Sequence, residues 1–223
     1  MRTVRRMAGG ACTAYSRVAM ITLHAAKSSN SQRVSIALEE CGVPYRVQRW
    51  SLMDGEHKAP AFEALNPAGM VPVLVDDDGP GGPLTLTQSG AILLYLAEKT
   101  GRFVPHGPLA RARMHEWLAF TISDIVGAST GIFVNTAILP DKSAANLAFY
   151  EERLLRYLRV ADARLAGREW LADELSIADF ALYPLVALRG ALIERGGGLS
   201  HLERWRDALA ARPAVERGMK AFD

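Results

Sequence analysis

A run of short polar side chains, Lys27-Ser28-Ser29-Asn30-Ser31, stands between two segments of different hydrophobic period. Residues 20–25 alternate as a β-strand does, whereas the apolar residues of segment 34–41 recur at helical spacing. The polar run therefore lies where a strand gives way to a helix, beside the free N–H groups of the first helical turn. A hydroxyl together with a helix N-terminus can stabilise an anion. The alternative is that the run only caps the helix, as such runs do in most proteins.

A second polar pair, Gln88-Ser89, stands at a similar transition. Residues 84–87 favour a strand, and residues 88–99 favour a helix that ends at Thr100-Gly101. The Ser89 hydroxyl and the first-turn N–H groups then face one small volume, which attracts a carboxylate. Ser89 would also serve as a helix cap, and the two roles are compatible.

A proline opens the expected strand Val71-Pro72-Val73-Leu74-Val75. A trans proline at the first residue of a strand is ordinary. A cis bond would instead turn the Val71 backbone outward and leave its N–H and C=O for an extended ligand, which would bind as an extra strand.

These candidate residues are spread over a region whose elements follow the order βαβαββα. The expected strands lie at 20–25, 45–50, 71–75 and 84–87, and an acidic, glycine-rich segment at 76–83 is expected to form a solvated turn rather than a metal site. A linker rich in proline and glycine follows at 101–108, and everything from Ala110 onward favours helices, with breaks near Pro140, Gly167, residues 196–198 and Pro213. Within this half, residues 176–179 (SIAD) form a capping box, which gives Asp179 a structural rather than a catalytic role.

Two motifs make the pattern specific: residues 66–74 (NPAGMVPVL) and residues 88–96 (QSGAILLYL). Together they resemble the N-terminal domain of cytosolic glutathione transferases. Residues 38–40 (LEE) and the segment 52–62 are most similar to the bacterial nu-type and prion-regulator-like branch. The resemblance covers Met20 to Asp223, strongly in the first half and loosely in the second.

The resemblance implies an α/β thioredoxin-like glutathione-binding domain at 20–100, a linker at 101–109 and an all-α domain at 110–223. It also implies a homodimer in which the glutathione half of one subunit packs on the helical half of the other. Residues 1–19 are basic and free of acidic residues, and we expect them to form a disordered extension, with Met20 as the functional start.

In the resembled branch a Thr and an Asn, two residues apart, contact the sulfur of glutathione, which implies Ser28 and Asn30 as the catalytic pair. A free thiol titrates near 8.5 and only the thiolate is a good nucleophile, so the pair must stabilise the anion. Lowering the thiol pKa by two units requires about 2.7 kcal/mol. Lys27, Ser29 and Ser31 replace the prolines and glycine that usually flank the pair, so Ser29 remains an alternative to Ser28.

The resemblance places the rest of glutathione as well. Val71 and a cis Pro72 would bind its backbone, and Gln88 and Ser89 would bind its γ-glutamyl end. His57 falls near the position of the glycine carboxylate, although a lone loop histidine is more often solvated.

Composition limits the other classes of function. Residues 20–223 carry a net charge of −2 with no basic stripe, which argues against a nucleic-acid binder. Two cysteines in unrelated contexts and apolar runs shorter than about 18 residues indicate a cytoplasmic protein with no metal site and no membrane partner.

The resulting hypothesis is a detoxification-type enzyme whose glutathione thiolate attacks an electrophile, a disulfide or a peroxide. The alternative is a non-catalytic interaction or regulatory protein on the same fold. The sequence does not indicate the second substrate.

Overall fold

The structure is a computed structural model that describes residues 20–223; the expectation for residues 1–19 lies outside this range. The first half contains a four-stranded sheet of order β2-β1-β3-β4. The expected βαβαββα order and the thioredoxin-like class are confirmed. Its elements are β1 (Ile21–Ala25), α1 (Ser29–Cys41), β2 (Tyr45–Arg49), the 3-10 turn η1 (Glu56–Lys58), α2 (Pro60–Glu63), β3 (Val73–Gly79), β4 (Gly82–Thr87) and α3 (Ser89–Thr100).

Strand pairing brings three chain segments to one edge of this sheet. β1 runs parallel to β2 and antiparallel to β3, and β3 runs antiparallel to β4. His24 pairs with Val73, and Val73 pairs with Thr87 on its other side. The end of β1, the beginning of β3 and the end of β4 therefore lie next to one another.

The expected solvated turn at 76–83 is partly wrong. β3 begins two residues later than expected and continues through the acidic run. Asp76 is 1% exposed, accepts a hydrogen bond from Tyr95 Oη at 2.6 Å and pairs with Lys99 Nζ at 2.8 Å. Helix α3 lies over this part of the strand and supplies both partners, which a local turn signal cannot reveal.

The second half is all helical, as expected. Its elements are α4 (Pro108–Phe120), the π-helical turn η2 (Thr121–Ile125), α5 (Val126–Phe133), the π-helical turn η3 (Val134–Ile138), α6 (Ala144–Leu165), α7 (Ile177–Leu188), α8 (Gly190–Arg195), α9 (Ser200–Ala210) and α10 (Pro213–Lys220). α4 begins at Pro108, two residues before Ala110, from which helices were expected.

The sequence predicted no segment that is long and apolar enough to span a membrane. The continuous helical run Pro108–Ile138 differs from this expectation. It has 31 residues and a window of mean hydropathy 1.5, so by length and composition alone it could cross a membrane. Core helices of soluble proteins meet the same criterion, which makes this weak evidence.

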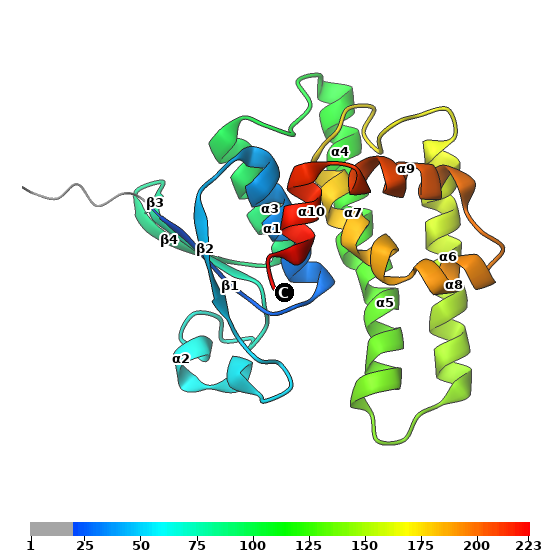
Figure 1. Cartoon of the computed structure of the whole chain (residues 1–223), viewed down its shortest axis with the longest axis horizontal. Coiled ribbons are helices and arrows are strands. Elements are labelled where there is room, and N and C mark those ends of the chain that lie inside the picture. Colours follow the sequence, from blue (N-terminus) through cyan, green and yellow to red (C-terminus); the bar gives the residue numbers. More distant parts are fainter. Residues whose placement is uncertain (1–19) are drawn as a thin grey trace, which may run out of the picture.

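Helices α1 and α3 lie between the sheet and the helical half, and both pack on α7 (Figure 1). α7 is buried over most of its length and begins at the expected capping box of Ser176 and Asp179. The fully buried Asp179 also accepts hydrogen bonds from Leu171 N–H and Trp205 Nε1. Burial raises the pKa of this carboxyl to about 6, and these hydrogen bonds act in the opposite direction.

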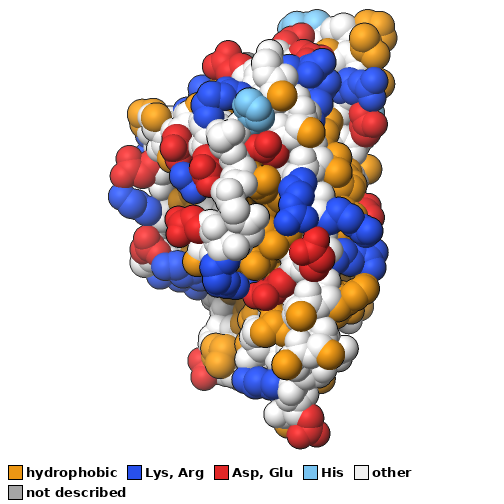
Figure 2. All heavy atoms as spheres, turned by 90° about the vertical axis from the view of Figure 1, so that its right-hand side faces the viewer, with side chains coloured by type: hydrophobic (Ala, Val, Ile, Leu, Met, Phe, Trp, Pro, Cys, Tyr) orange, Lys and Arg blue, Asp and Glu red, His pale blue; other side chains and the backbone are white. Residues whose placement is uncertain are grey.

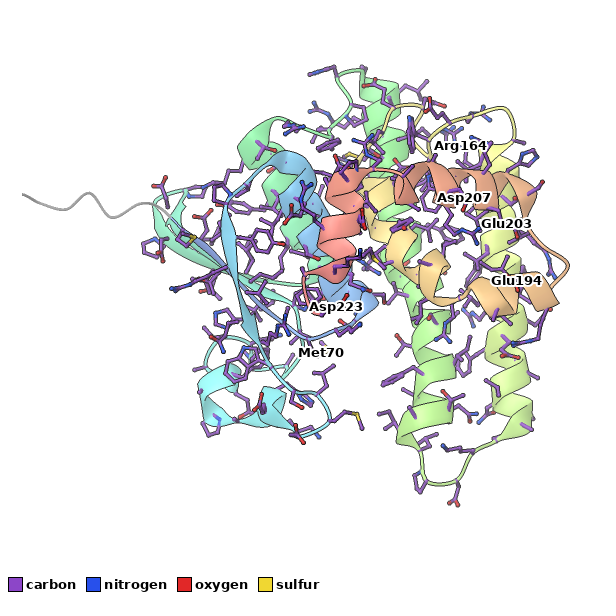
Figure 3. The ribbon with its side chains drawn as sticks, in the orientation of Figure 1. Met70, Arg164, Glu194, Glu203, Asp207 and Asp223 are labelled. Carbon is purple, nitrogen blue, oxygen red and sulfur yellow. The ribbon has the colours of Figure 1, made fainter. Side chains whose placement is uncertain are left out.

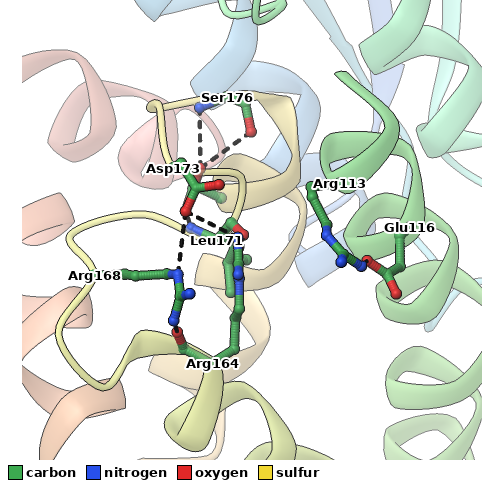
Figure 4. Close-up of polar contacts among 8 residues, drawn as sticks. Arg113, Glu116, Arg164, Arg168, Leu171, Asp173 and Ser176 are labelled. Carbon is green, nitrogen blue, oxygen red and sulfur yellow. Dashed lines mark hydrogen bonds and ion pairs between the residues drawn. The ribbon is translucent and has the colours of Figure 1, made fainter. Parts of the chain in front are cut away.

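The loop between α6 and α7 is joined to α6 by the ion pair of Arg164 with Asp173, and Arg168 within the loop pairs with the same carboxylate. Arg164 and Arg168 reach Asp173 Oδ1 at 3.0 and 3.2 Å, next to the bonds from Ser176 (Figure 4). The ion pairs are largely exposed, so they orient the loop more than they stabilise it.

Helix α10 packs closely on α1 (Figure 1). A Cβ on Gly218 would lie 2.5 Å from Ile36 Cα, which is why only glycine allows this approach. Ser35 Oγ donates to Gly218 C=O at 2.6 Å, and Arg212 forms a bidentate pair with the buried Glu40. Asp223 lies beside the first turn of α1, where it pairs with Lys27 (Figure 3).

Candidate active site at the sheet edge

The register described above brings the sequence-predicted residues together. Ser28 and Asn30 follow β1, Val71 and Pro72 precede β3, and Gln88 and Ser89 follow β4. These three strand ends are neighbours in the sheet. The site is therefore built from three turns at one edge, with α1 and α3 both beginning there.

Ser28 is the N-cap of α1, and Ser29 is the first helical residue. The Ser28 hydroxyl accepts a hydrogen bond from Ser31 N–H at 3.3 Å, and its Oγ lies 3.1 Å from Ser31 Oγ. The capping role considered from sequence is therefore present. The cap is compatible with a second role. The Ser31 hydroxyl can donate to Ser28 Oγ, and the Ser28 proton can then turn toward a ligand.

Asn30 is half-buried on the first turn of α1. Its Oδ1 is buried and has no hydrogen-bond partner within residues 20–223. Oδ1 is an acceptor, so only the Nδ2 group of this amide could donate to an anion.

The Val71–Pro72 bond is cis, which confirms the expectation drawn from the resemblance. In the described part of the chain, neither the N–H nor the C=O of Val71 pairs with another backbone group. Val71 is half-buried and Pro72 is buried. An extended ligand can therefore pair with Val71 as an added strand.

Gln88 is the N-cap of α3 with φ 67° and ψ 110°, and its side chain makes no capping bond. This is a sparsely populated conformation for a residue with a side chain, and such residues often lie at functional sites. Ser89 is 8% exposed and occupies the first position of α3, so it is not the cap. The first turn of α3 contains no acidic residue, which leaves its N–H groups open to an anion.

His57 lies on η1, where its carbonyl would be 3.2 Å from a Cβ on Gly69. It is thus near the segment that leads into Val71. Its Nδ1 is buried with no partner among residues 20–223, so the imidazole is not simply solvated.

Sequence analysis missed Arg33. This α1 residue is 0% exposed, and its Nη1 lies 3.4 Å from Ser89 Oγ. The available signal was its place on the apolar face of α1, next to Val34 and one turn before Ala37. Sequence analysis also missed Ser31, which was treated only as a replacement of a flanking residue.

The comparisons with known proteins agree with this geometry. Residues 27–99 match the family model of the glutathione S-transferase N-terminal domain, and residues 114–213 match that of the C-terminal domain. Two relatives from Escherichia coli K12 bear the name disulfide-bond oxidoreductase. YghU is 33% identical over 89% of this chain and 73% of its own length, and YfcG is 33% identical over 90% of this chain and 94% of its own. The chain belongs to the glutathione S-transferase family.

Solved structures of other transferases have the same fold. The enzyme from Pseudomonas putida, with one glutathione disulfide bound per subunit, gives a TM-score of 0.84 at 32% identity, covering 90% of this chain and 91% of that one. The enzyme from Burkholderia graminis, with two glutathione molecules per subunit, also gives 0.84, at 33% identity, with coverage of 90% and 88%. Ure2p in complex with glutathione gives 0.81 at 25% identity, with coverage of 92% and 94%.

These relatives place this glutathione transferase with the nu-type and Ure2p-like branch, as the sequence motifs indicated. The transferase holds no group of three or more His, Cys, Asp or Glu within residues 20–223 that could bind a metal ion.

Proposed function

We propose that this transferase binds glutathione at the sheet edge and uses its thiolate to reduce disulfides. The observation that carries the proposal is the convergence of three turns at neighbouring strand ends, where Asn30 Oδ1 and the Val71 backbone groups have no partner among residues 20–223. In this arrangement the cysteinyl backbone of glutathione pairs with Val71 beside Pro72. The γ-glutamyl carboxylate binds at Gln88 and Ser89, and the glycine carboxylate lies near His57.

The sulfur then lies at the first turn of α1, where Ser28 and Asn30 donate hydrogen bonds to the thiolate. A hydrogen bond to a charged group contributes about 1.5 to 3 kcal/mol, and the helix N-terminus adds about 0.3 to 1 kcal/mol. The sum is comparable to the roughly 2.7 kcal/mol needed for a pKa two units lower.

In the proposed reaction the thiolate attacks one sulfur of a disulfide, which expels the other sulfur as a thiolate that takes up a proton. The thiolate of a second glutathione attacks the glutathione sulfur of the mixed disulfide and expels the remaining substrate sulfur as a thiolate, which takes up a proton. Glutathione disulfide is formed, so two thiols are oxidised for each disulfide reduced. Both Escherichia coli relatives are named for disulfide chemistry, and the Pseudomonas putida structure holds glutathione disulfide.

A coupled assay tests this proposal directly. Glutathione, glutathione reductase and NADPH are combined with bis(2-hydroxyethyl) disulfide, and NADPH oxidation is compared with and without the protein. The protein should accelerate the reaction well above the uncatalysed exchange. Binding of glutathione without any acceleration, for this or another small disulfide, would contradict disulfide reduction. If the aryl halide assay described below were negative as well, the regulatory alternative would be favoured.

Conjugation of an electrophile is the second candidate, because glutathione S-transferase 3 of Zea mays is 32% identical over 87% of this chain and 90% of its own length. An aryl halide assay run in parallel distinguishes the two reactions.

The remaining features are proposed with the function. The division into 20–100, 101–109 and 110–223 separates a glutathione-binding unit from a helical unit, against which the second substrate lies. The protein works as a cytoplasmic homodimer in detoxification. On the face shown in Figure 2, Lys and Arg side chains are interspersed with Asp, Glu and apolar ones, which supports a role without nucleic acid.

A further inference from the structure

The guanidinium of Arg33 is buried at the junction of α1 and α3. The residue is 0% exposed, and its one hydrogen bond, at 3.4 Å, goes from Nη1 to Ser89 Oγ. Its Nε and Nη2 are buried without partners in residues 20–223. No ion pair joins it to an acidic side chain of this range.

A buried, unpaired cation is unfavourable, and proteins normally pair such groups. Burial lowers the pKa of Arg33 to about 10, which leaves it protonated at neutral pH. Among residues 20–223 nothing compensates this positive charge, which lies directly behind the first residue of α3. The N-terminus of this 12-residue helix adds partial positive charge at the same place.

The hydrogen bond to Ser89 connects the Arg33 guanidinium to the candidate site. A guanidinium can only donate, so Ser89 Oγ is the acceptor and its own proton is left for another acceptor. Ser89 is 8% exposed and thus forms the boundary between Arg33 and the surface of the site. The group that completes this chain of donors is an anion with an accepting oxygen.

We propose that Arg33 is a positioning residue for the γ-glutamyl α-carboxylate of glutathione. It fixes the Ser89 hydroxyl as a donor and supplies the countercharge to the bound carboxylate. The inference rests on the proposed binding of glutathione at this edge, and it adds a residue that acts through Ser89.

Calorimetry with three ligands tests the inference. The ligands are glutathione, γ-aminobutyryl-cysteinyl-glycine, which lacks only the α-carboxylate, and the glycinamide analogue, which lacks the other terminal carboxylate. Arg33→Met should weaken glutathione binding by about 10- to 100-fold, as expected for a charge-assisted contact. The same loss should persist with the glycinamide analogue and should nearly vanish with the ligand that lacks the α-carboxylate.

Thermal unfolding separates this role from a structural one. Replacing an unpaired buried charge by an apolar side chain is often neutral or stabilising, so unliganded Arg33→Met should unfold at or above the wild-type temperature. Its stabilisation by glutathione should be smaller. Arg33→Gln, uncharged but still able to donate to Ser89, provides a second variant should Arg33→Met not fold.

Two outcomes would overturn the inference alone: wild-type affinity in a folded uncharged variant, or an equal loss with all three ligands. A wild-type protein that binds none of the ligands would overturn the proposed function and the inference with it.

Discussion

At the scale of single residues, the Ser28 hydroxyl has an observed role as a helix cap, and we propose a chemical role for it as well. It caps α1 by accepting from Ser31 N–H, and it donates to Ser31 Oγ at 3.1 Å. For the proposed role this proton turns toward sulfur, and Ser31 Oγ becomes the donor. Ser31 is one of the residues that replace the usual flanking prolines and glycine, and its hydroxyl lies within hydrogen-bond distance of Ser28 Oγ. The altered flanking residues are therefore compatible with the proposed catalytic pair.

The pair can be tested by substitution. Ser28→Ala should raise the pKa of bound glutathione and slow turnover near neutral pH by about 5- to 30-fold, the equivalent of about 1 to 2 kcal/mol. Asn30→Ala should act in the same direction, and the two effects should not add because both residues hold one sulfur. Ser28→Thr keeps the hydroxyl and should retain most activity. The pH–rate profile is the measurement.

Ser29→Ala is the matched control, since Ser29 is not the cap of α1. Should this variant lose activity while Ser28→Ala keeps the wild-type profile, the catalytic assignment would be wrong by one residue.

Gln88 offers a prediction about strain. Its backbone conformation, with φ 67°, is unfavourable by about 1 to 3 kcal/mol for a residue with a side chain. Glycine adopts such a conformation without this cost. Gln88→Gly should therefore unfold at a higher temperature than Gln88→Ala, although glycine also favours the unfolded chain. Both variants lose the side chain and should bind glutathione more weakly to a similar extent. Equal melting temperatures would show that the backbone conformation is not strained.

At the scale of elements, the position of α1 depends on α10. The two helices approach so closely at Gly218 that a Cβ there would meet the Ile36 backbone at 2.5 and 2.6 Å. The pair between Arg212 and the buried Glu40 fixes the same contact. Ser28 and Asn30 lie at the N-terminus of α1, so the contact with α10 helps to fix the position of this turn.

Gly218→Ala should therefore destabilise the protein by about 1 to 3 kcal/mol, because the backbone must shift to admit the methyl group. It should also reduce turnover through movement of α1. Gly127→Ala is the control: a Cβ there has open space, and alanine in a helix interior is more stable by about 0.5 to 1 kcal/mol. Thermal unfolding of both variants checks this, and equal melting temperatures would contradict the close contact.

The elements also show what sequence could predict. Strand and helix order followed from local periodicity, and the capping box at Ser176 was visible as a motif. The burial of Asp76 was not predictable, because its partners Tyr95 and Lys99 come from a helix that follows in the chain. Arg33 was missed for the same reason, since its importance depends on Ser89, 56 positions away.

At the scale of the whole molecule, the proposed homodimer follows from the family resemblance. Sedimentation equilibrium at micromolar concentration should give twice the 24.3 kDa mass of the chain. A mass of one chain, unchanged by glutathione, would contradict this assembly.

We propose that the fold brings three turns together so that the thiol of bound glutathione ionises to the thiolate. The most direct test is the pKa of the glutathione thiol in its complex with the wild-type protein, followed by the ultraviolet absorbance of the thiolate. We predict a value about two units below the free thiol's value near 8.5, with Ser28→Ala returning it toward that value. A bound thiol that titrates like the free one would contradict the central claim.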